Sequence, residues 1–185
     1  LFLDRDGIAA ALAVVDQRAE TLKAEFKELV GCGPGQHAKV LAWFVAAGVT
    51  MPDPEDDLKR VPLGNLQADT LNEVLEDGVH NKVVRRALEI RLAINKASTK
   101  KLDAMARQVG GDGRARYQTR YHGAATGRNT GSGIQPLNLN KGFAAKDGWD
   151  RVTPEQLVRD IMYGNARYLD AVYGDATDAV AKAAR

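Results

Sequence analysis

The sequence predicts a mainly helical protein with a small β element, an α+β chain built on long antiparallel helices. Apolar residues recur at steps of three and four over residues 6–30, as on one face of a helix, and a second helix over residues 80–109 can turn one set of apolar residues toward a partner: Val84, Leu88, Ile94, Leu102, Met105 and Val109. Residues 114–121 are instead rich in Tyr, Thr and Arg, which is typical of a strand. The low aromatic content of 6% and an apolar set dominated by Ala and Leu also favour helices.

The first helix has the clearest pattern, and its apolar residues form one stripe with charges elsewhere. Asp4 or Asp6 can cap its start, and the Gly-Cys-Gly-Pro-Gly run at 31–35 ends it. A shorter helix is predicted for residues 36–47, where Gly48 stops it. The residues of the stripe are Ile8, Leu12, Val15, Ala19, Leu22, Phe26 and Leu29.

The rest of the N-terminal region is predicted as a loop followed by two helices. Residues 50–68 are rich in Pro and Asp and indicate a surface loop, after which Asp69 caps a helix over residues 70–76. Residues 80–109 are predicted as one long second helix. Residues 1–109 thus form a helical region with a small helical insertion at about 36–79.

The C-terminal region, residues 110–185, begins with a tight turn and the predicted strand. Residues 123–148 lack periodicity, and a loop of this length is usually functional or disordered. A capping box with proline at the first helical position starts at Thr153 and opens further helices toward Arg185.

Charge is distributed unevenly along the chain. The formal net charge is +2, but the window 82–128 carries twelve basic residues against three acidic ones, a net of +9. A basic block in an otherwise acidic protein favours a polyanionic partner, and the alternative is a solvated basic helix face. The basic residues are Lys82, Arg85, Arg86, Arg91, Lys96, Lys100, Lys101, Arg107, Arg114, Arg116, Arg120 and Arg128.

Several classes of protein are disfavoured. Cys32 is alone, so no internal disulfide forms, and the three histidines lack metal-ligand spacing. No apolar run reaches the roughly 18 residues of a membrane span, and the acidic start argues against a signal peptide. We therefore expect a cytoplasmic protein without a metal site. The absence of an initiator Met and the helical pattern at the end lead us to expect a fragment.

The segment from Tyr121 to Arg128 reads Tyr-His-Gly-Ala-Ala-Thr-Gly-Arg, a strand end that delivers an arginine into a glycine-rich loop. Gly127 allows close approach of the backbone to a ligand, and Arg128 offers a planar fork of donors for phosphates or base edges. The amides of Gln135 and Asn138 suit a nucleic-acid minor groove. An ordinary polar loop is the alternative.

These residues resemble a conserved segment of A-family DNA polymerases, most closely the bacteriophage branch. There a Thr-Gly-Arg leads through a polar stretch to an ending similar to Gln135-Pro-Leu-Asn138-Leu, just before the first catalytic Asp. The helix with Glu89-Ile-Arg91, Lys96 and Thr99 is similar to the thumb helix that grips primer–template duplex. The resemblance covers most of the chain and implies a thumb-like region at 1–109 and the start of the palm at 110–185.

The resemblance also implies roles for individual residues. Arg128 would reach the primer end through the minor groove, near the incoming nucleotide, and Gln135 and Asn138 would contact template and primer. Arg91 would contact the DNA backbone. The full set of implied DNA-binding residues is Arg128, Thr126, Gly127, Gln135, Asn138, Arg91, Lys96, Thr99 and Lys100. Two departures from the family, Asn95 where Lys is common and Asn140 where Pro is usual, affect individual DNA contacts.

The resemblance implies a monomeric DNA-directed DNA polymerase, a nucleotidyltransferase of DNA replication in a bacterial or phage-infected cell. The whole enzyme would use Mg²⁺ and deoxynucleoside triphosphates to extend a primer. Its metal-binding carboxylates are expected after Arg185, so this chain alone is predicted to be inactive. Two alternatives remain: a stand-alone, non-enzymatic DNA-binding protein, and a helical phage structural or interaction protein.

Overall fold

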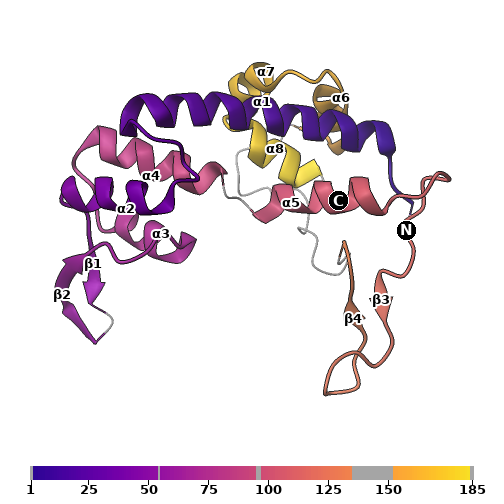
Figure 1. Ribbon diagram of the computed structural model, residues 1–185. Coiled ribbons are helices and arrows are strands. Elements are labelled where there is room, and N and C mark those ends of the chain that lie inside the picture. Colours follow the sequence, from indigo (N-terminus) through magenta and orange to yellow (C-terminus); the bar gives the residue numbers. More distant parts are fainter. Residues whose placement is uncertain (1, 54, 95–96, 135–151, 184–185) are drawn as a thin grey trace. The chain divides into compact units, whose positions relative to one another are not determined.

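The computed structural model describes residues 2–53, 55–94, 97–134 and 152–183, with the backbone alone described at 57–58 and 97–100 (Figure 1). Helices dominate and two small antiparallel sheets complete the structure, so the predicted mainly α fold with a small β element is confirmed. Within the described residues the chain forms two compact units. Unit 1 comprises residues 1–18 and 97–185, and unit 2 comprises residues 19–96; α1 (Arg5–Val30) contributes to both.

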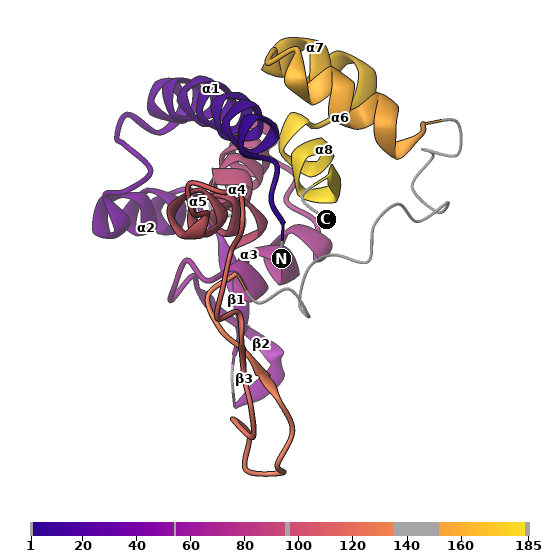
Figure 2. The same ribbon diagram turned by 90° about the vertical axis from the view of Figure 1, so that its right-hand side faces the viewer.

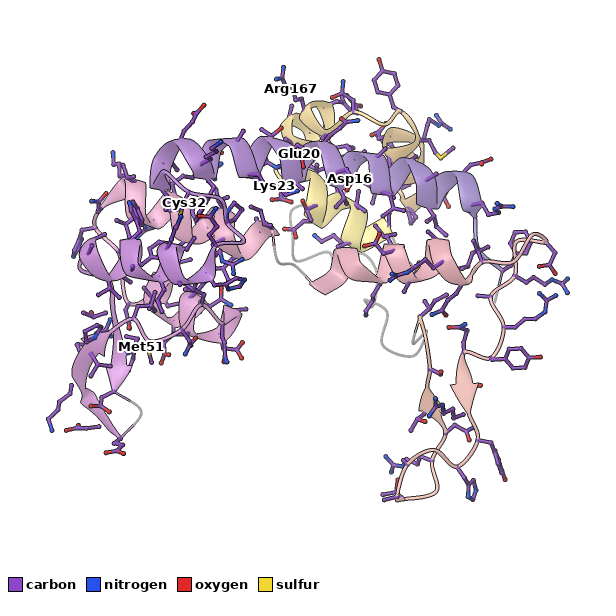
Figure 3. All side chains as sticks on the ribbon, viewed as in Figure 1. Asp16, Glu20, Lys23, Cys32, Met51 and Arg167 are labelled. Atoms are coloured by element: carbon purple, nitrogen blue, oxygen red, sulfur yellow. The ribbon has the colours of Figure 1, made fainter. Side chains whose placement is uncertain are left out.

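Unit 2 contains the C-terminal part of α1, α2 (His37–Ala46), α3 (Ala68–Glu76) and α4 (Lys82–Ile94). Its core is a cluster of apolar side chains that includes the fully buried Phe26, Phe44 and Leu88. The predicted helices over residues 6–30 and 36–47 are confirmed, because Gly31 and Gly48 leave the helical conformation at φ +78° where expected. Cys32 packs against this core as a free thiol (Figure 3).

The surface loop predicted at 50–68 is wrong over much of its length. β1 (Thr50–Asp53) and β2 (Asp56–Pro62) pair as an antiparallel hairpin, with Met51 opposite Val61. The ladder is irregular at Pro52/Asp53, where an edge strand tolerates proline. The Met51 sulfur (Figure 3) accepts a hydrogen bond from the Gly64 amide at 3.3 Å. The turn-forming residues in this segment therefore made a short hairpin look like a loop in the sequence.

The helix predicted at 70–76 exists but is not capped by Asp69. It begins at Ala68 after Gln67, whose own amide donates to Asn65 Oδ1 at 2.9 Å. Asp69 lies instead in the first turn of α3, where its negative charge interacts favourably with the positive end of the helix dipole.

The helix predicted at 80–109 is helical in both of its described parts. These parts are α4 and α5 (Ala97–Gln108), which belong to different units; residues 95–96 between them lie outside the described residues. Val84 and Leu88 are buried in the core of unit 2, whereas Leu102 and Met105 are buried in that of unit 1. Between Ile94 and Leu102 the sequence has no large apolar residue, and the apolar side chains on either side serve different cores.

Unit 1 combines the N-terminal part of α1 and α5 with α6 (Pro154–Met162), α7 (Ala166–Tyr173) and α8 (Ala176–Ala183). Figures 1 and 2 both show α6, α7 and α8 grouped together. Its core includes Val14, Leu157 and Leu169, each fully buried. The predicted cap of α6 is confirmed, because Thr153 Oγ1 accepts a hydrogen bond from the Gln156 amide at 3.2 Å.

Among the described helices, none combines the length and apolar character that crossing a bilayer requires. The division predicted at residue 109 concerns regions of a polymerase rather than compact units, and it stays a prediction.

Tyr173 makes the stability of unit 1 depend on pH in the alkaline range. Its hydroxyl donates to Asp160 Oδ2 at 2.6 Å, and burial together with this bond raises the pKa of Tyr173 above its ordinary value. A raised pKa contributes stability that is complete below the unfolded-state pKa of about 10 and is lost as pH rises through the folded-state pKa.

We therefore expect the free energy of unfolding of unit 1 to fall above about pH 10, and Tyr173→Phe to remove that part of the decline. At neutral pH this substitution should cost about 1.5 kcal/mol, since it deletes a hydrogen bond to a carboxylate. Urea unfolding at neutral and alkaline pH tests both points. Tyr163→Phe, at a tyrosine that is 75% exposed, is the control. A pH dependence that Tyr173→Phe leaves unchanged would contradict the assignment.

Candidate nucleic-acid interface

The predicted site lies on a hairpin of unit 1 that extends from its helices (Figures 1 and 2). β3 (Thr119–Arg120) pairs antiparallel with β4 (Thr130–Gly131), and the Ser132 amide continues the ladder to the Gln118 carbonyl at 2.8 Å. The strand predicted at 114–121 is thus confirmed only at its end. Residues 114–118 run irregularly, apart from a bridge between Arg114 and Phe2.

The loop at the end of the hairpin is closed by its own hydrogen bonds. The Gly127 amide donates to the Ala124 carbonyl at 2.9 Å, and the Ala124 amide donates to the Arg128 carbonyl at 3.2 Å. Gly127 has φ +74°, a left-handed conformation that a side chain would strain. A Cβ there would meet no atom closer than 3.7 Å, so conformation rather than space calls for glycine. This turn sets the direction in which Arg128 leaves the loop.

The side chains of this hairpin are exposed and cationic. Arg128 and Thr126 are both exposed, and the Tyr121 and His122 rings stack with centroids 4.4 Å apart. Between residues 110 and 134 there are four arginines and one acid, Asp112. A surface with this balance attracts polyanions. The four arginines are Arg114, Arg116, Arg120 and Arg128, all exposed.

Asp112 neutralises one of these cations. Both of its oxygens accept from the Arg116 guanidinium, and these bonds lower the pKa of Asp112 and raise the pKa of Arg116. Arg128 and Arg114 have no ion pair within the described part of the chain. Their positive charges therefore face solvent.

Arg91 lies elsewhere than the resemblance implied. It is 4% exposed in α4, and its Nη2 lies 3.2 Å from His37 Nδ1 in unit 2. Burial lowers the pKa of Arg91 from its ordinary value. A guanidinium in this position braces α2 against α4 and does not present its charge to a surface ligand.

A second cationic side chain of α4, Arg86, pairs with a carboxylate of this same chain. The Arg86 guanidinium forms two hydrogen bonds to the Glu25 carboxylate, at 2.6 and 2.8 Å, which raise the pKa of Arg86. The basic block of the sequence is therefore divided: part of it ties unit 2 together, and the exposed arginines of the hairpin belong to unit 1.

The other predicted residues are less fully described. Lys96, Gln135 and Asn138 lie outside the described residues, as do Asp147 and Asp150, and Thr99 and Lys100 are placed by backbone alone on α5. In the described ranges no group of three His, Cys, Asp or Glu could hold a metal ion.

A groove of about 460 Å³ lies beside Arg114, Arg116 and Tyr117 at the base of the hairpin, and it was not predicted from the sequence. The Arg-x-Arg spacing, which places both side chains on one face of an extended segment, was the signal available.

The chain is similar to the DNA polymerase of Bacillus phage SP02, with 30% identity over 139 residues. The similarity covers 74% of this chain, but the matched region is only 19% of the length of that polymerase. No protein-family model matches the sequence, and no solved structure matches the chain. The similarity supports a polymerase origin for the chain and relates it to a portion of a phage DNA polymerase.

Proposed function

We propose that this chain is part of a template-directed DNA polymerase and contributes a surface that grips the primer–template duplex. The similarity to the phage SP02 DNA polymerase carries the proposal, because it extends over both compact units rather than over one motif: its 139 residues exceed the length of either unit. In this reading residues 1–109 correspond to the thumb and residues 110–185 to the start of the palm.

The hairpin of unit 1 supplies the contact with DNA. Arg128 follows a glycine turn with its guanidinium exposed, so that it can enter the minor groove at the primer end. The acceptors there are similar for every base pair, so an arginine can sense pairing geometry without reading sequence. Arg114 and Arg120 are placed to neutralise phosphates. Arg91 is left out of this surface because it is buried.

Catalysis itself would require the rest of the polymerase. Nucleotidyl transfer uses carboxylate-bound Mg²⁺ ions to activate the primer hydroxyl and stabilise the leaving pyrophosphate. The residues that hold them would be supplied outside the described part of this chain. The chain alone would bind duplex as a monomer, neither bind nucleotide productively nor extend a primer, and act in the cytoplasm of a bacterial or phage-infected cell.

Salt dependence of duplex binding tests this proposal. Two to four exposed arginines on phosphates should give log K against log salt a slope of about −2 to −4 between about 50 and about 200 mM salt. Fluorescence anisotropy of a labelled primer–template with the purified chain measures it, with and without EDTA. The slope should not require divalent metal. No binding at the lower salt concentration would sink the proposal.

An interaction protein is the second candidate, and one observation favours it. α6, α7 and the residue after α6 expose apolar side chains, among them Met162, Tyr163 and Val172. Such side chains can mark a protein contact. An absence of salt-dependent duplex binding would favour this candidate over the polymerase.

A further inference from the structure

The groove at the base of the hairpin has the size and lining of a nucleotide site. Its volume is about 460 Å³, within the range of small-molecule sites, and Arg114, Arg116 and Tyr117 line it from the irregular segment that precedes β3. It belongs wholly to unit 1. A wall that combines guanidinium groups with an aromatic ring suits a ligand that carries a phosphate and a flat base.

Tyr117 holds an unfavourable backbone conformation and displays its ring. Its φ is +58°, a left-handed value that costs a non-glycine residue about 1–3 kcal/mol. The side chain is 91% exposed, so burial of the ring does not compensate for this strain. Strain of this kind persists where the surrounding structure enforces it and is concentrated at ligand sites.

The neighbours of Tyr117 on both sides explain how the strain is enforced. Arg116 is fixed by two hydrogen bonds to Asp112. The side-chain amide of Gln118 donates to Gln108 Oε1 at 3.0 Å and to the Arg116 carbonyl at 2.7 Å, while its oxygen accepts from the Ile134 amide at 2.8 Å. The chain is thus clamped before and after Tyr117, and the ring is the part left to project.

Gly133 lines the groove in a backbone conformation that favours glycine. A Cβ there would lie 2.3 Å from Gln108 Oε1, and φ is +61°. The contact at Gln108 involves the end of a flexible side chain, so φ rather than space calls for glycine there. Gln108 in turn holds Gln118 beside the groove.

We propose that this groove binds a single-stranded nucleotide, with an unpaired base stacked on Tyr117 and its phosphate on Arg114. A duplex interior offers no free base face, whereas every unpaired base does, so the exposed ring favours single-stranded DNA. Arg114 has no ion pair in the described residues and is free to take the phosphate. The proposal rests on the proposed DNA function and assigns to it a second, single-stranded contact apart from Arg128.

The test uses the 185-residue chain and fluorescein-labelled oligo(dT) of about 12 nucleotides, followed by anisotropy. Tyr117→Gly removes the ring at a φ that glycine accepts readily, so it leaves the fold intact or more stable. We expect this variant to bind about five- to a hundredfold more weakly, as loss of one stacked base does. Tyr117→Phe should keep the affinity, and Tyr163→Ala, at an exposed tyrosine that follows α6, is the matched control.

Measuring binding at several salt concentrations separates the contribution of base stacking from that of charge. The deficit of Tyr117→Gly should persist as salt is raised, whereas Arg114→Gln should reduce the magnitude of the slope of log K against log salt by about 0.7. If Tyr117→Gly binds oligo(dT) as the parent chain does while Arg128→Ala still weakens duplex binding, the groove proposal is wrong and the proposed function still stands. An equal loss on single-stranded and duplex DNA would also overturn it. Failure of the parent chain to bind either DNA would remove the proposed function itself.

Discussion

Arg128→Ala, introduced into a full-length polymerase that carries this chain, should lower the rate of primer extension by about two to three orders of magnitude. The reason is positional. The backbone at Arg128 is fixed by the Gly127 turn and by hydrogen bonds across the loop, which would direct the side chain toward the primer end proposed above. Donors preorganised at developing charge act mainly in the transition state, and their loss appears in the rate.

Affinity for the duplex should change much less, by under about tenfold, because other cations of the hairpin still contact phosphates. Single-turnover extension at saturating nucleotide measures the rate, and anisotropy measures the affinity. Arg120→Ala is the matched control, since Arg120 is exposed on β3 of the same hairpin. It should weaken duplex binding and leave the rate at saturation unchanged.

Arg128→Lys separates the effect of the positive charge from that of the planar guanidinium. Lysine keeps the charge but loses the planar fork, so it should restore affinity without restoring rate. Equal losses of rate and affinity in Arg128→Ala would instead assign the residue to general phosphate binding. Recovery of full rate in Arg128→Lys would show that charge alone suffices.

Phe26→Ala should destabilise unit 2 by about 3–5 kcal/mol, the cost of removing a large aromatic side chain from a packed core. Phe26 is fully buried in the apolar cluster of that unit. Because small domains have a stability of only about 5–15 kcal/mol, the most protected amides of α2 and α4 should exchange about two to four orders of magnitude faster.

Hydrogen exchange read by mass spectrometry resolves the two units separately. Leu169→Ala is the matched variant in unit 1, since Leu169 is equally buried in the other cluster. It should accelerate exchange in α6, α7 and α8 and not in α2 and α4. If either variant raised exchange to the same degree throughout the described helices, the two cores would be one cooperative unit.

The helices of this protein could be predicted wherever apolar residues form one continuous stripe. The stripe from Ile8 to Leu29 predicted α1, and Thr153 with Pro154 predicted the start of α6. Capping and periodicity are local properties, so they are readable along the chain. The hairpin arginine was equally readable, because a glycine turn beside an exposed cation is a local arrangement.

Contacts between residues that are far apart in the sequence could not be predicted in the same way. The β1–β2 ribbon was taken for a loop because its Pro and Asp residues resemble turn signals, and only cross-strand pairing reveals it. Arg91 was expected to contact the DNA backbone from the resemblance to a thumb helix, but α4 buries it beside His37. The strained φ of Tyr117 follows from the clamps on both sides of it.

The amino-acid sequence by itself determined where most helices begin and end, and it placed a cationic, glycine-bordered segment in the middle of the chain. The tertiary structure alone decided that the basic stretch from Lys82 to Arg128 is divided between two cores. Period and caps depend on neighbouring residues. Whether a charged side chain faces solvent or a partner depends on which distant apolar residues exclude water around it.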